Sequence, residues 1–347
     1  MAGRLVIPLT GGEHDLDPLL EMVGDAPFVF LGEATHGTHE FYRTRAEITK
    51  RLIAERGFSA VCVEGDWPDA YRINRYVRGA GDDAEAIDSL TGFRRFPTWM
   101  WRNADVLDFI GWLREYNDGV TGHRHKAGFY GLDLYSMYAS IDAVLRYLDD
   151  IDPDAARRAR LRYDCLTPYE ASTESYAYAL FSGEASCKQD VLDQLLEIQR
   201  NAAAYARVDG RVAEDEYFYA EQNARVVASA ERYYRTMLDH RVSSWNLRDE
   251  HMADTLDRLV RHLARSIGPC KAVVWAHNSH VGDARATSMG SRGETNIGAL
   301  ARERYGDGVV LVGFTTFEGT VTAASEWHEP EERKRVRPAR PDSYESL

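Results

Sequence analysis

The sequence lacks the features that mark several common classes of protein. Its 42 lysines and arginines are outnumbered by 55 aspartates and glutamates, which gives a formal charge of −13. Binding to nucleic acid or to an anionic membrane needs clustered basic residues, so we expect neither partner. No apolar run approaches the roughly 20 residues of a membrane span, and residues 1–12 lack the apolar stretch of a signal peptide. We therefore expect a cytoplasmic protein that acts on a small neutral or cationic molecule.

Several catalytic signatures are absent as well. No Gly-x-Ser-x-Gly elbow occurs, which disfavours a serine esterase of the common kind. The sequence contains neither a phosphate-binding loop nor a Gly-x-Gly-x-x-Gly dinucleotide fingerprint. The four cysteines, Cys62, Cys165, Cys187 and Cys270, are scattered without paired metal spacing. We predict reduced thiols, no bound metal and no cofactor, with Cys62 and Cys270 as packing residues.

Five short apolar, β-branched stretches predict a buried parallel sheet. They are residues 28–31, 60–63, 127–130, 272–275 and 309–314. Helical patterns separate them along the chain, over 40–56, 103–116 and 140–148. This alternation is typical of an α/β fold, here a mostly parallel sheet flanked by helices.

The middle of the chain has a different pattern. No convincing strand occurs between about residues 154 and 266, and helical periodicity covers 192–206, 214–238 and 247–266. We interpret residues 151–266 as a helical insertion or cap on an α/β core. That core consists of residues 1–150 and 267–347. We expect the charged segment 329–347 to be irregular.

Ionisable side chains directly follow four of the predicted strands. In open α/β sheets, ligands bind beyond the carboxyl ends of the strands. If the strands are parallel neighbours, these side chains converge on one crevice. They are Glu33 and His36 after the first strand, Glu64 after the second, Asp133 after the third, and His277 and His280 after the fourth.

Each of these residues has a structural alternative when taken alone. A carboxylate that follows a strand often caps the next helix, and Asp133 fits that role equally well. A single loop histidine is more often a satisfied surface group than a catalyst. Two glutamates and three histidines at one edge would carry a desolvation cost without a packing gain, which favours a functional site.

The helix after the first strand adds Arg45 to the candidate site. Arg45 shares an apolar stripe with Phe41 and Leu52, the face expected to pack on the sheet. A buried arginine needs a carboxylate partner, which Glu33 or Glu64 could supply. The alternative is that its stem carries the guanidinium out to water.

Several blocks of the sequence together resemble the erythromycin esterase-like family. The first is GEATHGTHEF at 32–41, followed by Arg45 in the next helix. The resemblance extends from about residue 25 to residue 347, with the blocks in the family's order. The further blocks are VEGDW at 63–67, WMWRN at 99–103, FYGLDL at 129–134, SWNLRD at 244–249 and WAHNSHV at 275–281.

The resemblance implies a hydrolase that opens a carboxylic ester or lactone, because characterised members of the family hydrolyse the macrolide lactone of erythromycin. It implies that His36 is the general base that activates water. Glu33 and Glu64 would orient or polarise His36, and Arg45 would hold these carboxylates.

The resemblance also implies roles for the later blocks. His277 and His280 would bind the carbonyl oxygen or complete the network around the base. Relatives continue past residues 343–345, so we expect further substrate wall or sheet beyond this chain. The expected substrate contacts are Asp133, Trp99, Trp101 and Asn278.

Three other functions stay open at this point. The same glutamates and histidines could ligate zinc, manganese or iron in a metal-dependent hydrolase, although Arg45 would compete for the carboxylates. The chain could instead bind haem or a large hydrophobic metabolite without hydrolysis, with aromatic residues lining the pocket. The third possible function is that of a biosynthetic tailoring enzyme that forms esters or amides rather than hydrolysing them. The sequence leaves the oligomeric state open.

Overall fold

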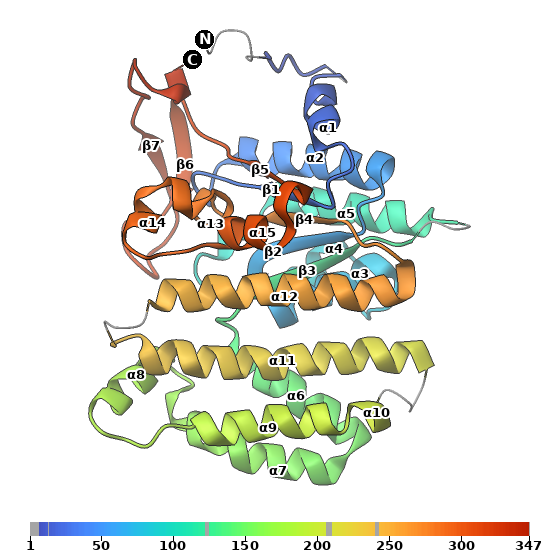
Figure 1. Cartoon of the computed structure of the whole chain (residues 1–347), viewed down its shortest axis with the longest axis vertical. Coiled ribbons are helices and arrows are strands. Elements are labelled where there is room, and N and C mark those ends of the chain that lie inside the picture. Colours follow the sequence, from blue (N-terminus) through green and yellow to red (C-terminus); the bar gives the residue numbers. More distant parts are fainter. Residues whose placement is uncertain (1–6, 13, 122–124, 206–209, 240–242, 347) are drawn as a thin grey trace.

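A five-stranded parallel sheet forms the centre of the computed structural model, which describes residues 7–12, 14–121, 125–205, 210–239 and 243–346 (Figure 1). The strand order is β3-β2-β4-β1-β5 and every neighbouring pair is parallel. This confirms the predicted α/β class. The strands are β1 (Phe28–Leu31), β2 (Ala60–Asp66), β3 (Gly128–Asp133), β4 (Ala272–Trp275) and β5 (Val309–Val312).

All five predicted strands exist, with small differences at their ends. Strands β2 and β3 run three residues further than predicted, so Glu64 and Asp133 belong to the strands themselves. Strand β5 ends two residues earlier than predicted. Polar residues therefore occupy strand positions that an apolar pattern cannot reveal.

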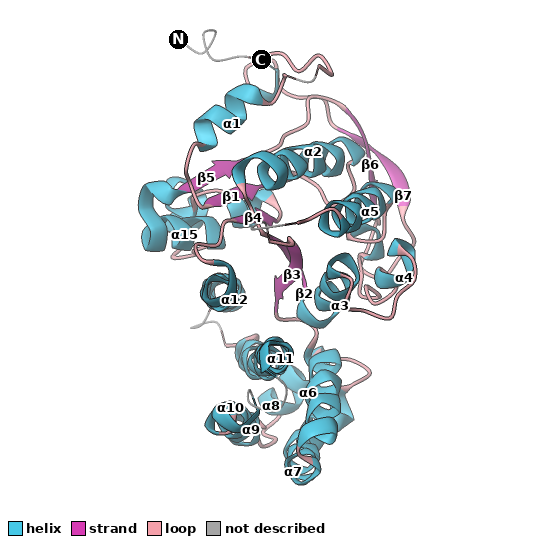
Figure 2. Cartoon of the chain, turned by 90° about the vertical axis from the view of Figure 1, so that its right-hand side faces the viewer, coloured by secondary structure: helices cyan, strands magenta, loops and turns pink. Residues whose placement is uncertain are grey.

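Helices cover both faces of the sheet (Figure 2). Alternate strand residues such as Val29 and Val61 pack with helices α2, α3 and α5 on one face. The residues between them, such as Phe30 and Cys62, pack with α12 and α15 on the other. These helices are α2 (His39–Arg56), α3 (Trp67–Arg78), α5 (Ala104–Asp118), α12 (Ser244–Ile267) and α15 (Ile297–Tyr305).

A separate layer of helices lies beyond α12, in the lower half of Figure 1. Its members share their own apolar core, which includes Leu148, Ala159 and Val227. Helix α12 lies between this layer and the sheet (Figure 2). The layer contains α6 (Met137–Ile151), α7 (Pro153–Tyr163), α8 (Glu174–Phe181), α9 (Lys188–Arg200), α10 (Ala202–Tyr205) and α11 (Gly210–Thr236).

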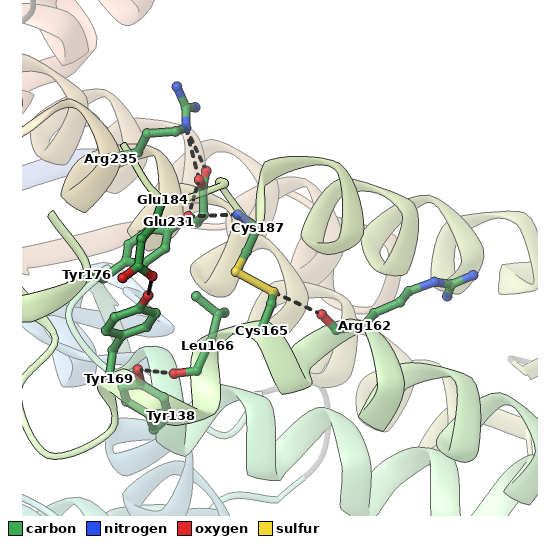
Figure 3. Close-up of a disulfide and its surroundings, with 10 residues drawn as sticks. All are labelled: Tyr138, Arg162, Cys165, Leu166, Tyr169, Tyr176, Glu184, Cys187, Glu231 and Arg235. Atoms are coloured by element: carbon green, nitrogen blue, oxygen red, sulfur yellow. Dashed lines mark hydrogen bonds and ion pairs between the residues drawn. A yellow bond between two sulfur atoms is a disulfide. The ribbon is translucent and has the colours of Figure 1, made fainter. Parts of the chain in front are cut away.

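A disulfide joins Cys165 to Cys187 in this layer (Figure 3). The expectation of four reduced thiols is therefore wrong for this pair, whereas Cys62 and Cys270 are free and buried as predicted. The two partners are 22 residues apart in sequence, and only the packing of the segment after α7 beside the start of α9 brings them together. We expect reduced thiols because scattered cysteines are typical of a reducing compartment, and the paired Cys165 and Cys187 do not support that expectation.

An antiparallel hairpin of β6 (Gly319–Ala323) and β7 (Glu332–Val336) lies beside the main sheet. The charge of segment 329–347 predicts an irregular structure, and β7 corrects that expectation. Strand β7 reads Glu-Arg-Lys-Arg-Val, so it lacks the apolar alternation of a half-buried strand. Pairing with β6 supplies its backbone hydrogen bonds instead.

The remaining helices are short. None of the helices formed by the described residues is long and apolar enough to cross a membrane. The short helices are α1 (Asp17–Val23), α4 (Ala86–Ser89), α13 (Asn278–Val281) and α14 (Ser288–Ser291).

Candidate active site

The strand order places the polar strand ends side by side. Strand β4 lies between β1 and β2, so His277 after β4 is flanked by the ends that carry Glu33 and Glu64. A cavity of about 810 Å³ opens at this edge. Its wall includes His36, Glu64, Asp133, His277 and His280 from the sheet side.

Glu33 fixes the orientation of His36. Its Oε1 lies 2.9 Å from His36 Nδ1, and it is fully buried. The His36 side chain keeps 32% of its surface exposed at the cavity wall. Because Nδ1 is bound to the carboxylate, Nε2 is the nitrogen left to act on a ligand.

Burial opposes protonation of His36, but its hydrogen bond to Glu33 and the charges of Glu64 and Glu33 outweigh burial and raise its pKa above the usual 6.5. A raised pKa makes the imidazole a stronger base.

Arg45 binds the Glu33 oxygen that does not contact His36. Its Nη2 donates to Glu33 Oε2 over 2.9 Å, and both side chains are fully buried. The sequence predicts a carboxylate partner for Arg45, and the structure supplies Glu33. Arg45 Nε and Nη1 have no hydrogen-bond partner among the described residues, but the guanidinium lies 4.4 Å from the Tyr42 ring centroid and 5.1 Å from that of Trp275. These ring faces offer electrostatic compensation.

Glu64 is held by partners at both carboxylate oxygens. Oε1 accepts from Arg248 Nη2 over 2.8 Å, and Oε2 accepts from the backbone N–H of His277 over 2.8 Å. Burial favours the neutral acid, yet the positive charges of His280 and Arg248 hold the pKa of Glu64 well below its usual value. Glu64 is therefore a carboxylate that ties the end of β2 to the loop after β4.

Arg248, on α12, lines the cavity and binds two of the strand-end carboxylates. Its Nε and Nη2 donate to the two oxygens of Asp133 over 3.0 and 2.7 Å. Asp133 is fully buried, and this forked contact satisfies both of its carboxylate oxygens. Asp133 also accepts from the backbone N–H of Leu134 over 2.8 Å, so it serves the start of the next segment as well. Its main partner is Arg248.

His280 is a second histidine paired with a carboxylate. Its Nδ1 lies 2.8 Å from Asp249, and its ring stacks on Trp245 with centroids 4.4 Å apart. Burial opposes its charge, but Glu64 and Asp249 raise its pKa to about 9. Its Nε2 lies 3.0 Å from Arg248 Nη1 and 3.4 Å from Glu64 Oε1, so this nitrogen contacts both members of the Glu64–Arg248 ion pair.

His277 has both ring nitrogens occupied within the protein. Nε2 lies 3.1 Å from the Ala34 carbonyl, and the Ser279 N–H donates to Nδ1 over 3.2 Å. This pattern requires a neutral ring with its proton on Nε2. Burial and the nearby His36 lower the pKa of His277 in agreement. The ring centroids of His36 and His277 are 5.2 Å apart.

Of the four expected substrate contacts, the described cavity wall includes Trp99 and Asp133 but neither Trp101 nor Asn278. Trp101 is buried and donates from Nε1 to the Glu64 carbonyl over 3.2 Å. Asn278 donates from Nδ2 to the Phe314 carbonyl over 2.7 Å and so fastens the loop after β5. Both side chains therefore hold the scaffold in this structure, and neither lines the described cavity wall.

Sequence reasoning does not find several charged residues near the cavity, among them Arg95, Arg248 and Asp249. Arg248 and Asp249 lie in the SWNLRD block, which gives a signal but no role. Arg95 lies 3.2 Å from Asp66, with its guanidinium 4.6 Å from the Tyr135 ring centroid. Arg248 and Asp249 come from the first turns of α12, a helix that packs on one face of the sheet, and reasoning from strand ends does not find helix residues of this kind.

The donor set does not fit a resident metal. Among the residues that the structure describes, no group of three or more histidine, cysteine, aspartate or glutamate side chains has the geometry to hold a metal ion. The carboxylates that would be ligands are bound by Arg45 and Arg248.

Comparison with known proteins identifies the family. The profile of the erythromycin esterase family matches residues 53–347. The chain therefore belongs to the erythromycin esterase family. It is similar to the erythromycin esterase type II of Escherichia coli, with 23% identity over 321 residues that cover 89% of this chain and 73% of that relative.

Solved structures share the fold. A succinoglycan biosynthesis protein matches with a TM-score of 0.71 and 23% identity, covering 96% of this chain and 77% of its own. A Bacillus cereus protein gives 0.72 and 24%, with 98% and 79% covered. An erythromycin esterase variant, EreC, in its open conformation gives 0.72 and 18%, with 96% and 82% covered.

Proposed function

We propose that this protein hydrolyses a carboxylic ester or lactone with water activated by His36, without a nucleophilic serine. The observation that carries this proposal is the Glu33–His36 pair, which leaves Nε2 of a raised-pKa imidazole at the wall of a large cavity. A neutral imidazole in this position can take a proton from water as the water attacks a carbonyl. Membership of the erythromycin esterase family supports the same reaction class.

The other charged groups have distinct roles in this proposal. Glu33 accepts a hydrogen bond from His36 Nδ1–H and stabilises the imidazolium that forms when Nε2 takes the proton of water. Arg248 lines the cavity and its Nη1 carries two N–H groups, one of which donates to the oxyanion, a contribution often worth about 3 kcal/mol. His36 then returns its proton to the departing alkoxide, giving a carboxylic acid and an alcohol. His277 is a neutral residue of the cavity wall. It does not donate to the substrate, because both its ring nitrogens are engaged within the protein.

The test is a panel of small esters, bulky esters and macrolactones incubated with the wild-type protein. We expect an acid and an alcohol, or an opened hydroxy acid, identified by liquid chromatography and mass spectrometry. Activity should survive dialysis against a chelator, because Arg45 and Arg248 occupy the carboxylates. Turnover of no member of the panel would contradict the proposal.

A second candidate is a binding protein for a bulky hydrophobic metabolite. The observation that favours it is the number of aromatic side chains in the cavity wall, including Trp99, Tyr135 and Tyr233. The same panel separates the two functions. Tight binding of bulky members without any product would support the binding protein.

A further inference from the structure

Four ring side chains from two distant segments meet on the outer wall of the cavity. Phe96 and Trp99 precede α5, whereas Trp327 and His328 lie in the turn between β6 and β7. The Phe96 ring centroid lies 5.2 Å from that of Trp99, 5.1 Å from Trp327 and 5.5 Å from His328. We call these four residues the rim cluster.

The rim cluster has features that packing alone does not explain. Trp327 is 72% exposed although it contacts Phe96. His328 has a φ of 67°, the one positive φ at a non-glycine position in the described part of the chain. Exposed large rings and backbone strain both concentrate at binding sites, where they are retained for a ligand.

The hairpin that carries Trp327 and His328 is fastened to the loop of the proposed base. The Thr322 N–H donates to the Gly37 carbonyl over 3.0 Å. A Cβ added at Gly37 would lie 2.0 Å from the Thr322 carbonyl oxygen, so only glycine permits this approach. The hairpin therefore spans from the neighbour of His36 to the rim cluster, and it forms the cavity wall between them.

The two ends of the cavity differ in chemistry. One end, which we call the floor, carries the charged groups Glu64, Asp133 and Arg248. Arg248 binds both carboxylates there. The rim presents the apolar rings of Phe96, Trp99 and Trp327. A volume of about 810 Å³ is in the range of pockets that enclose whole organic ligands. An ester carbonyl at His36 thus leaves room for a large apolar group toward the rim.

We propose that the rim cluster binds the apolar part of a bulky ester and selects large substrates over small ones. This inference rests on the proposed hydrolase function and assigns Trp327 and Phe96 as specificity-determining residues. Ring faces gain by stacking on a flat or alicyclic apolar group, and truncation of an aromatic anchor in a binding pocket is typically costly.

The kinetic test compares Trp327→Ala and Phe96→Ala with wild type on p-nitrophenyl acetate and on the p-nitrophenyl ester of a bulky polycyclic acid. We expect the ratio of kcat/KM for the bulky ester to that for acetate to fall roughly 10-fold or more in both variants. Phe317→Ala is the matched control, since Phe317 is an exposed aromatic residue beside the same hairpin and outside the described cavity wall. Its ratio should stay within about twofold of wild type.

A binding measurement keeps this inference separate from the hydrolase assignment. Isothermal titration calorimetry with the ketone analogue of the bulky ester, which cannot be hydrolysed, should give a Kd raised roughly 10-fold by Trp327→Ala and unchanged by Phe317→Ala. Equal Kd values for wild type and Trp327→Ala would overturn the inference even if esters are cleaved. Failure to cleave any ester, with Trp327-dependent binding intact, would instead refute the hydrolase function.

Discussion

Histidine protonation in the site is set by which carboxylate each ring contacts. Glu33 raises the pKa of His36, and Glu64 with Asp249 raises that of His280, in both cases against the effect of burial. His277 contacts a carbonyl and a serine instead, and its pKa is lowered. Near neutral pH, the site therefore combines a basic His36, a cationic His280 and a neutral His277.

This difference predicts the pH dependence of the reaction. The base must be neutral to accept a proton, and its pKa is raised in the folded protein, so activity is lost as the pH falls through that raised value. We expect kcat/KM of the wild type to rise with pH and to reach half its maximum above pH 6.5. Initial rates over about pH 5 to 9 would check this. A midpoint below 6.5 would mean that His36 is not the titrating base.

At the scale of elements, α12 completes a site that the strands begin. Its Arg248 binds Asp133 from β3 and Glu64 from β2, so one guanidinium bridges two strand ends. Removing one partner of a buried ion pair leaves the other charge uncompensated.

We predict that Arg248→Met lowers the free energy of unfolding by about 3–5 kcal/mol. The measurement is equilibrium denaturation in urea. Arg265→Met is the control on the same helix, since Arg265 is largely exposed and should change stability by at most about 0.5 kcal/mol. Equal midpoints for the two variants would show that Arg248 does not stabilise the cavity floor.

The disulfide acts on the outer helical layer. The bond between Cys165 and Cys187 closes a loop with a sequence separation of 22 residues (Figure 3). This loop carries α8, whose Glu174 reaches the cavity wall. Tyr176 holds the same loop, because its hydroxyl donates to Glu231 over 2.9 Å and accepts from the Cys187 N–H over 2.9 Å. The loop is thus secured by a covalent and a hydrogen-bonded link.

Reduction of this disulfide should destabilise the protein by about 3 kcal/mol, the scale expected for a loop of this length. Thermal unfolding with and without dithiothreitol would measure the change in Tm. The double variant Cys165→Ala/Cys187→Ala should show no response to the reductant. A wild type that is equally insensitive, or that titrates four free thiols when unfolded without reductant, would refute the bond.

At the scale of the whole molecule, the sequence predicts the sheet better than it predicts what covers it. Strands such as residues 28–31 are short, uninterrupted apolar runs, and such runs between helical patterns are typical of strands buried on both faces. The crevice follows from strand polarity, since parallel strands end at one edge. The role of Arg248 is not predicted because it lies on a helix far along the chain from the strands it contacts. The hairpin is not predicted because its strand β7 is charged and lacks an apolar pattern.

The same limit applies to Trp101 and Asn278, which the sequence suggests as substrate contacts and which do not line the described cavity wall. Trp101 and Asn278 belong to sequence blocks that resemble the family, but membership of a block does not distinguish a side chain that faces the cavity from one that holds the scaffold. The distinction depends on packing: Trp101 turns its indole N–H to the Glu64 carbonyl, and Asn278 binds Phe314. A sequence pattern contains no information at that resolution.

The most direct test of the proposed mechanism is kcat/KM on a cleaved ester for His36→Ala, beside His39→Ala as control. His39 lies three residues away, is largely exposed and binds Asp105. We predict that His36→Ala loses at least ~100-fold, the usual scale for a general base, while His39→Ala retains most of its activity. Equal activity of His36→Ala and wild type would contradict the role of His36 as the base.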